Sequence, residues 1–227
     1  MKYLILLSGK INTGKNQFAE FLKKALEDEG VKVKQDLYAR DLKDYSVEDF
    51  KMLGQVLDQQ VEKIKANIGM FFQMANVSMD VQDNIYRMLE ELTFKKENFY
   101  EDKTIVTRAL LQLYGTDIAR KRFDDQFWVK RMADRINEDI HHDVIIVTDV
   151  RFPNEVEDIY DFVKDVRVVP IRIERQMDRS ALENEHASET ALDDFKFWEY
   201  IVENNGTLND LLDYSKTVAK DILSPDE

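Results

Sequence analysis

The feature that most constrains this sequence is a loop with two glycines, placed between an apolar run and an amphipathic segment. Residues 3–8 form a short apolar run, which is typical of a strand buried on both faces of a parallel sheet. After the loop, apolar residues recur at spacings of three and four, and Gly30 supplies a helix stop. Residues 31–38 alternate and indicate a second strand. Strand, helix and strand in this order predict a right-handed βαβ unit and therefore an α/β fold.

The loop itself, GKINTGKN at residues 9–16, fits the phosphate-binding pattern G-x-x-x-x-G-K. Glycines allow consecutive backbone N–H groups to curve around a phosphate, and the following helix presents its positive end. Lys15 would reach the outer phosphates. Asn16 stands where this pattern usually has the Ser or Thr that ligates Mg²⁺. Its amide oxygen could bind the metal directly or through water; the alternative is that Asn16 marks an inactive nucleotide site.

The composition narrows the class of protein. The chain has 227 residues, 32 Lys and Arg against 45 Asp and Glu, and a net charge of −13. This charge argues against a general nucleic-acid binder and against a membrane-surface protein, so any anionic ligand must be held by local donors. The sequence contains no cysteine, which excludes disulfides and thiolate metal sites. No segment reaches the length of a signal peptide core or a membrane span, and we expect a cytoplasmic protein.

The rest of the chain divides into a helical middle and a second strand-rich part. Residues 47–139 are helical by period, with a helix expected at 104–120 and another carrying Val129, Met132, Ile136 and Ile140. The first apolar stripe, from Phe50 to Ile68, suits either the core or a homodimer interface. Further strands are expected at residues 144–148, 166–173 and 200–202, although Pro170 implies a late start or a bulge. A C-terminal helix follows, and Thr207 with Asp210 is close to a capping box.

Together these elements predict a three-layer α/β sandwich with a five-stranded parallel sheet. Residues 1–41 and 142–227 would form the core, with a lid near 174–190. Residues 42–141 would form a helical insertion that binds the substrate.

Polar residues follow the third and fourth predicted strands. Asp149 and Arg151 come after the third strand, and ligands of open α/β sheets bind beyond the carboxyl ends of strands. An Asp there can hold metal-bound water or a substrate hydroxyl, and an Arg can clamp a phosphate; the alternative is that the two pair with each other. Arg175 and Arg179 lie one helical turn apart and suit a lid over a transferring phosphoryl group, although a solvated basic face is the rival interpretation.

Four segments carry a resemblance to a known family. They are the loop at 9–16; the stretch 110–117 with 123–124 and 127–130; Asp149-x-Arg151; and 186–189 with 204–208. On these segments the chain resembles the P-loop nucleoside monophosphate kinase superfamily, and within it the phage deoxynucleoside monophosphate kinases. The block from Gln112 to Trp128 is the specific one and points to a deoxynucleotide; residues 44–103 contain no segment that matches.

The resemblance implies a role for each matching position. The ATP site would comprise Gly9, Lys10, Asn12, Thr13, Gly14, Lys15, Asn16 and Gln17, with Asn205 and Gly206 beside the adenine. The acceptor site would comprise Lys43, Arg108, Gln112, Asp117, Trp128, Asp149, Arg151 and Glu189. Lys15, Arg151, Arg175 and Arg179 would act on the phosphates, and Mg²⁺ would be held by Asn16 and Asp149.

The reaction implied by the resemblance is Mg·ATP + dNMP → ADP + dNDP, where dNMP and dNDP are deoxynucleoside mono- and diphosphates. The partners would be small nucleotides, without a nucleic-acid polymer or a membrane, and for a phage-encoded chain the compartment would be the host cytoplasm. Two alternatives stay open. One is a kinase for another phosphate acceptor, such as phosphomevalonate or dephospho-coenzyme A. The other is a nucleotide-binding module without catalysis.

Overall fold

The computed structural model describes residues 2–92, 105–176 and 190–224. The chain divides into two compact units, one formed by Met1–Tyr38 with Gln126–Glu227 and the other by Ala39–Asp125. The expected insertion ran to residue 141, whereas the second unit ends at Asp125. None of the described helices has the length and the apolar composition that crossing a bilayer requires.

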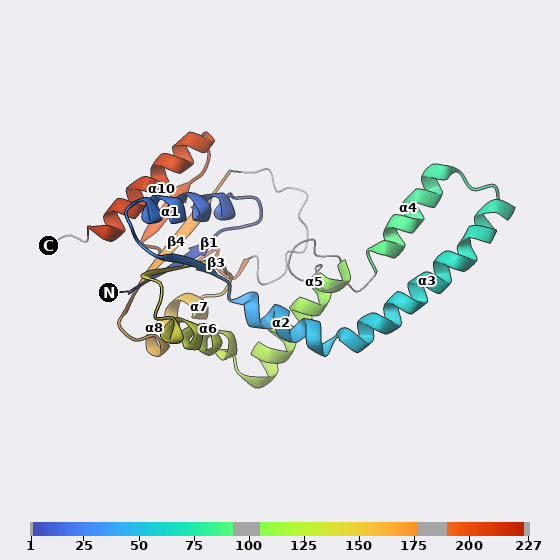
Figure 1. Cartoon of the computed structure of the whole chain (residues 1–227), viewed down its shortest axis with the longest axis horizontal. Helices are drawn as coiled ribbons and strands as arrows, with labels where there is room; N and C mark the ends of the chain where they lie inside the picture. Colours follow the sequence, from blue (N-terminus) through green and yellow to red (C-terminus); the bar gives the residue numbers. More distant parts are fainter. Residues whose placement is uncertain (1, 93–104, 177–189, 225–227) are drawn as a thin grey trace. The chain divides into compact units, whose positions relative to one another are not determined.

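The first unit is built on a five-stranded parallel sheet with the strand order β2-β3-β1-β4-β5, which confirms the predicted architecture (Figure 1). The strands are β1 (Lys2–Ser8), β2 (Val33–Asp36), β3 (Val144–Val150), β4 (Val166–Glu174) and β5 (Tyr200–Glu203). Helices α1 (Lys15–Asp28) and α10 (Leu208–Leu223) lie on one face of the sheet, and α6 (Phe127–Glu138), α7 (Asn154–Glu157) and α8 (Ile159–Phe162) lie on the other.

The core explains why the N-terminal segment folds in this way. Phe18, Leu22 and Leu26 project from one face of α1 and are completely buried against the sheet. In β1, residues 4–7 are buried on both faces because β1 is the central strand and helices cover both sides. Gly30, with φ +83°, ends α1 as the sequence predicts, since few other residues adopt this conformation without strain.

Pro170 neither starts nor bulges β4, so that expectation was wrong. It pairs in register with Leu6 of β1, in the middle of a continuous strand. Its carbonyl oxygen faces β5, where it accepts the N–H of Glu199 at 2.9 Å. The N–H that proline lacks would point to the same side, at a level where β5 has not yet begun, since the pairing there starts with Ile171 and Tyr200. The ladder therefore loses no hydrogen bond to β1.

The ends of two helices test predictions about single residues. The predicted capping box of α10 is confirmed: the Thr207 side chain accepts from the N–H of Asp210, and the Asp210 carboxylate accepts from the N–H of Thr207. Ile140 was expected on the buried face of α6. The helix ends at Glu138, and Ile140 is 83% exposed, so that expectation was wrong.

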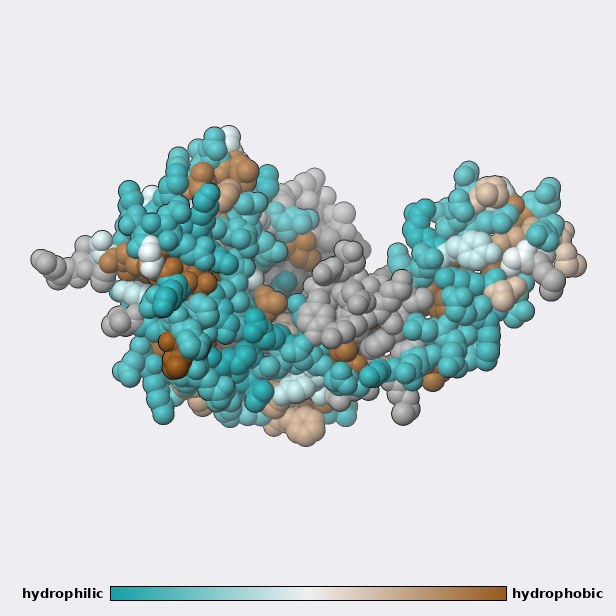
Figure 2. Space-filling view, in the orientation of Figure 1, coloured by the Kyte–Doolittle hydropathy of each residue, from teal (hydrophilic) through white to brown (hydrophobic). Residues whose placement is uncertain are grey.

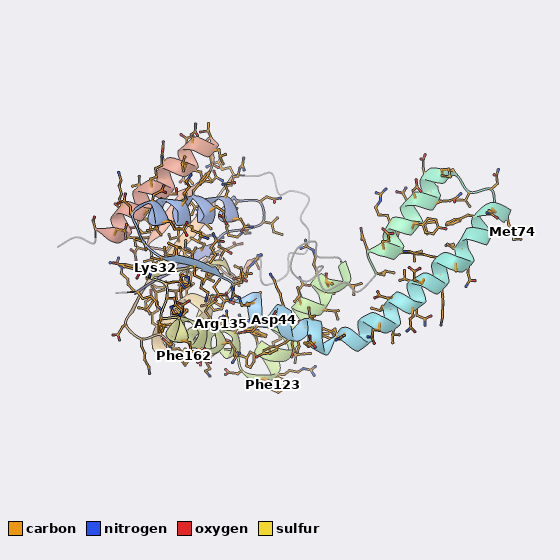
Figure 3. The ribbon with its side chains drawn as sticks, viewed as in Figure 1. Lys32, Asp44, Met74, Phe123, Arg135 and Phe162 are labelled. Atoms are coloured by element: carbon orange, nitrogen blue, oxygen red, sulfur yellow. The ribbon has the colours of Figure 1, made fainter. Side chains whose placement is uncertain are left out.

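The second unit is helical, as its period predicts. It contains α2 (Ala39–Asp49), α3 (Lys51–Met74), α4 (Met79–Glu90), α5 (Ile105–Gln112) and the π-helix η2 (Leu113–Phe123). Figure 2 shows apolar side chains on the visible surface of α3 and α4, and Met74 lies at the end of α3 (Figure 3). The helix expected at 104–120 therefore changes from α to π geometry at Leu113. Gly115 in η2 packs so closely on α2 that a Cβ atom there would collide with the Leu42 side chain. The missing side chain thus allows η2 to approach α2.

Candidate functional site

The loop between β1 and α1 has the backbone geometry of an anion cradle. Gly14 adopts φ +95° as the residue that caps α1, and Asn12 adopts φ +62°. A Cβ atom at Gly9 would come within 2.5 Å of the Ile173 carbonyl oxygen, so a larger residue would displace the loop from β4. The first turn of α1 holds no acidic residue, which leaves the positive end of the helix free to attract an anion.

Lys15 is held inside this loop. Its Nζ atom donates to the carbonyl oxygen of Gly9 and, at 2.8 Å, to that of Lys10. The ammonium group therefore lies over the loop instead of extending into solvent. Asn16 and Gln17 follow in the first turn of α1 and are exposed.

Strand β3 runs two residues beyond its expected end at residue 148, so Asp149 lies in the strand and Arg151 begins the turn that follows it, beside the strand that leads into the loop. Asp149 accepts the N–H of Tyr38 at 2.8 Å. The buried carboxylate of Glu155 accepts the N–H groups of Arg151 at 2.6 Å and Phe152 at 3.1 Å. The turn is thus fixed by its own backbone N–H groups, and the two expected site residues share the carboxyl edge of the sheet with the loop. Sequence reasoning missed Tyr38 and Glu155.

A chain of polar contacts beneath the loop was also missed. Ser8, at the end of β1, donates to the carbonyl oxygen of Val150 and accepts from Arg172 of β4 at 3.0 Å. Arg172 contacts Asp193 at 3.4 Å, and Asp193 also pairs with Lys10 of the loop at 2.7 Å. The signal in the sequence was the presence of Ser8 and Arg172, two polar residues, in otherwise buried apolar strands.

A pocket of about 400 Å³ opens at the carboxyl ends of β4 and β5, next to the loop. Its polar lining comprises Lys10, Thr13, Arg172, Glu174, Arg175, Gln176, Asp193, Glu203 and Asn205. Arg175 and Asn205 are therefore brought together with the loop residues Lys10 and Thr13. The Asn205 side chain also accepts the N–H of Gln176 at 2.8 Å, which ties the turn after β5 to the end of β4. Arg179 and Glu189 lie outside the described residues.

Asn204, which precedes Asn205, is another residue that sequence reasoning missed. Its side chain is buried and donates to the Thr13 carbonyl oxygen of the loop at 2.9 Å. Gly206 follows closely, and a Cβ atom there would lie 2.5 Å from the capping carboxylate of Asp210. The turn between β5 and α10 is thus packed against both the loop and the start of α10.

The remaining expected acceptor residues come from both units. In the second unit, Lys43 on α2 is buried, Arg108 and Gln112 on α5 are exposed, and Asp117 on η2 pairs with Lys121 at 2.7 Å. Trp128 belongs to the first unit. It is 4% exposed and packs edge-on against Phe127 with ring centroids 4.7 Å apart.

The donor set suits Mg²⁺ of the kind that nucleotide phosphates hold. Asn16 in the first turn of α1 carries an amide oxygen and Asp149 near the end of β3 carries a carboxylate, and Mg²⁺ prefers oxygen ligands. No cluster of three or more His, Asp or Glu residues that could cage a metal occurs in residues 2–92, 105–176 and 190–224. One or two protein oxygens completed by phosphates and water form the usual Mg²⁺ environment in such sites.

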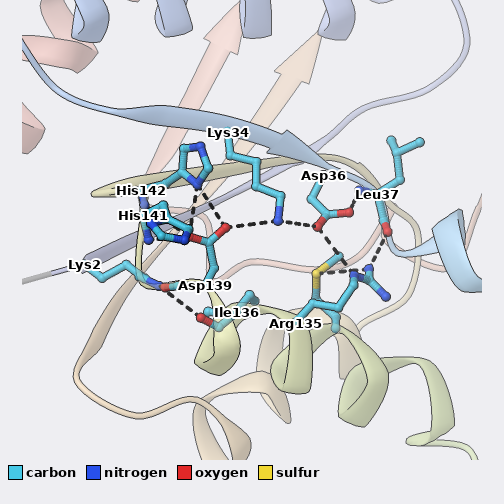
Figure 4. A network of polar contacts seen from close by, with 10 residues as sticks. Lys2, Lys34, Asp36, Leu37, Arg135, Ile136, Asp139, His141 and His142 are labelled. Atoms are coloured by element: carbon cyan, nitrogen blue, oxygen red, sulfur yellow. Dashed lines mark hydrogen bonds and ion pairs between the residues drawn. The ribbon is translucent and has the colours of Figure 1, made fainter.

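A second polar network lies at the opposite end of the sheet, where β1 begins (Figure 4). Lys2 donates to the carbonyl oxygens of Ile136 and Asp139 at the end of α6. The Asp139 carboxylate accepts from Lys34 at 3.0 Å and lies 3.0 Å from Nδ1 of His142. Burial alone would raise the pKa of Asp139, but the hydrogen bonds from His142, Lys34 and two backbone N–H groups hold the pKa well below its ordinary value. This network stabilises the fold and is distant from the loop.

Two comparisons with known proteins point to the same family. The family model described as deoxynucleotide monophosphate kinase matches residues 43–216, so the match extends over residues 44–103, where no matching segment was expected. A curated relative, the deoxynucleoside-5'-monophosphate kinase of Escherichia phage T5, is 39% identical over 62 residues, which are 27% of this chain and 24% of that protein. The chain thus matches about a quarter of the length of this relative. Since the family model covers well over half of the sequence, the chain belongs to the deoxynucleotide monophosphate kinase family.

Proposed function

We propose that this chain transfers the γ-phosphoryl group of ATP to a deoxynucleoside monophosphate, giving ADP and the diphosphate. The observation that carries the proposal is the loop with Lys15 folded over it, placed at the same sheet edge as Asp149 and Arg151. Phosphoryl transfer requires positioning and neutralisation of the charge on the γ-phosphoryl group, without a covalent intermediate. The loop and the sheet edge offer both.

The loop would bind the phosphate donor, ATP. The backbone N–H groups of the loop and the ammonium group of Lys15 would bind the β- and γ-phosphates of ATP. The nucleoside would extend toward the pocket lined by Arg175 and Asn205. When bound, Mg²⁺ would neutralise part of the phosphate charge, with Asn16 and Asp149 as its protein ligands.

The acceptor side would use Arg151 as its phosphate clamp. A guanidinium group can bind two phosphate oxygens at once, and the bonds from Arg151 and Phe152 to Glu155 fix the backbone that carries it. Lys43, Arg108, Gln112, Asp117 and Trp128 would bind the nucleoside. Asp149, held by Tyr38, would hold the acceptor or metal-bound water at the start of the transfer path.

A coupled assay of ADP release tests the reaction. The donor would be Mg·ATP, and the acceptors dAMP, dGMP, dCMP, dTMP and 5-hydroxymethyl-dCMP in separate reactions. We expect turnover with at least one of them and none without an acceptor. A chain that binds ATP but phosphorylates no member of the panel would contradict the proposal and would favour a different phosphate acceptor or a binding module. Because the T5 relative is a phage protein, we propose the cytoplasm of a bacterial host as the compartment.

A further inference from the structure

Asn204 is buried beside the phosphate loop, although no part of the proposed reaction uses it. It follows β5, and its backbone N–H donates to the carbonyl oxygen of Glu174 at 2.7 Å, which continues the pairing of β5 with β4. Its side chain is thereby aimed at the loop, where Nδ2 donates to the Thr13 carbonyl oxygen at 2.9 Å. The side chain also occupies the space that a Cβ atom at Gly14 would need.

The orientation of one peptide plane depends on this contact. The peptide bond between Thr13 and Gly14 is planar, so a carbonyl oxygen that points to Asn204 leaves the Gly14 N–H pointing to the opposite side. On the proposed function, that side is where the phosphate binds. Glycine tolerates both orientations of the preceding peptide plane, so Gly14 alone does not select one. Thr13 is buried, and its carbonyl oxygen needs a donor there.

We propose that Asn204 is a positioning residue that holds the Thr13–Gly14 peptide in the orientation that binds phosphate. The inference rests on the proposed function of the loop. It predicts that the amide group matters as a donor and not only for its volume. Asn204→Asp keeps the volume but replaces the donor with an acceptor and places a negative charge beside the loop.

The test compares Asn204→Ala and Asn204→Asp with the same two changes at Asn137. Asn137, near the end of α6, is the control because its Nδ2 also donates to a main-chain carbonyl oxygen, that of Phe162, at 2.9 Å; this bond is exposed and lies away from the loop. Calorimetry with Mg·ATP and with inorganic tripolyphosphate gives the dissociation constants. Steady-state kinetics give KM for each substrate, and thermal melts followed by circular dichroism report on folding.

We expect Asn204→Ala to weaken ATP and tripolyphosphate about tenfold, since a buried carbonyl loses its donor. Asn204→Asp should be weaker still, with KM for the deoxynucleotide unchanged, and the Asn137 variants should bind both ligands like the wild type. Equal binding by Asn204→Ala and the wild type would overturn the inference. So would an Asn204→Asp variant that binds better than Asn204→Ala, because volume alone would then explain the site. A wild type that binds ATP without turnover would contradict the proposed reaction and leave this inference standing.

Discussion

The cation of Lys15 lies within reach of the carbonyl oxygens of its own loop, a position it can leave when phosphates offer better acceptors. We expect Lys15→Ala to lower kcat/KM by roughly 10²–10³-fold, the usual effect of removing one group that neutralises transition-state charge. The fold should be unchanged, because Lys15 contacts carbonyl oxygens of the loop and is not part of the apolar core that joins α1 to the sheet. Coupled assays and thermal melts measure the two effects. Retention of more than a tenth of the activity would rule out this role.

Arg151 should affect the other substrate. Its backbone N–H is held by Glu155, so Arg151→Ala removes the guanidinium group without releasing the turn. We expect KM for the deoxynucleoside monophosphate to rise roughly 10- to 100-fold, as for the loss of a bidentate phosphate contact. KM for ATP should stay near the wild-type value. Initial rates over a grid of both substrates make the distinction, and an equal rise of both constants would contradict our placement of the acceptor phosphate.

Among the elements, the junction of α6 with β1 and β2 depends on the charge of Asp139. Its folded-state pKa is depressed, so the ionised carboxylate stabilises the fold above the unfolded-state pKa of 3.8, and this contribution is lost as the pH falls below that value. Asp139→Asn should therefore lower the urea midpoint at pH 7. The difference from the wild type should shrink as the pH falls from about 4 toward 2.

Asp143→Asn is the control for Asp139→Asn. Asp143→Asn also removes a carboxylate near the junction, but Asp143 accepts an exposed backbone N–H, that of Lys32. We expect a smaller change of the urea midpoint at pH 7 for this variant. A constant difference between Asp139→Asn and the wild type across the whole pH range would show that the charge of Asp139 is not what stabilises the junction.

Elements with strong local signals could be predicted from the sequence, whereas contacts between distant segments could not. The strand, loop and helix around Gly9 and Gly14 follow from glycine spacing and apolar period, and the α10 capping box follows from two residues three apart. The prediction for Pro170 was wrong because a proline is accepted within β4 only where β5 has not yet begun. The pairing of the strands shows where β5 begins, and the sequence does not. The close approach of Gly115 in η2 to Leu42, 73 positions earlier in the chain, likewise has no local signal.

In the candidate site, too, residues with a local signal could be predicted, and contacts between distant segments could not. The loop, Asp149 and Arg151 could be found because their residue types stand at or directly after the carboxyl ends of buried strands. Asn204 could not be assigned a contact, since its partner Thr13 lies 191 positions away. Glu155 was hidden in a helix turn whose acidic character resembles an ordinary solvated surface.

For the whole molecule, net charge and ligand binding act in opposite directions. A chain of net charge −13 repels anionic nucleotides at long range. Near the loop, however, Lys10, Lys15, Arg172 and Arg175 gather at the carboxyl edge of the sheet. These nearby cationic groups have to outweigh the long-range repulsion by the net negative charge. Their attraction is strongest where water is excluded, which favours binding in a pocket.

The two units should also differ in stability, because their cores differ. Residues 4–7 of β1 are completely buried, whereas none of the described residues of α4 is buried. We expect amides of β1 and β3 to exchange hydrogen only through global unfolding, and amides of α4 to exchange at least about 100-fold faster through local opening. Native-state hydrogen exchange followed by mass spectrometry measures both rates. Mg·ATP should slow exchange in the loop and α1 while leaving α4 unchanged, since the proposed donor site lies wholly in the first unit. Equal protection of α4 and β1 in the free chain would mean that α4 unfolds together with the core of the first unit.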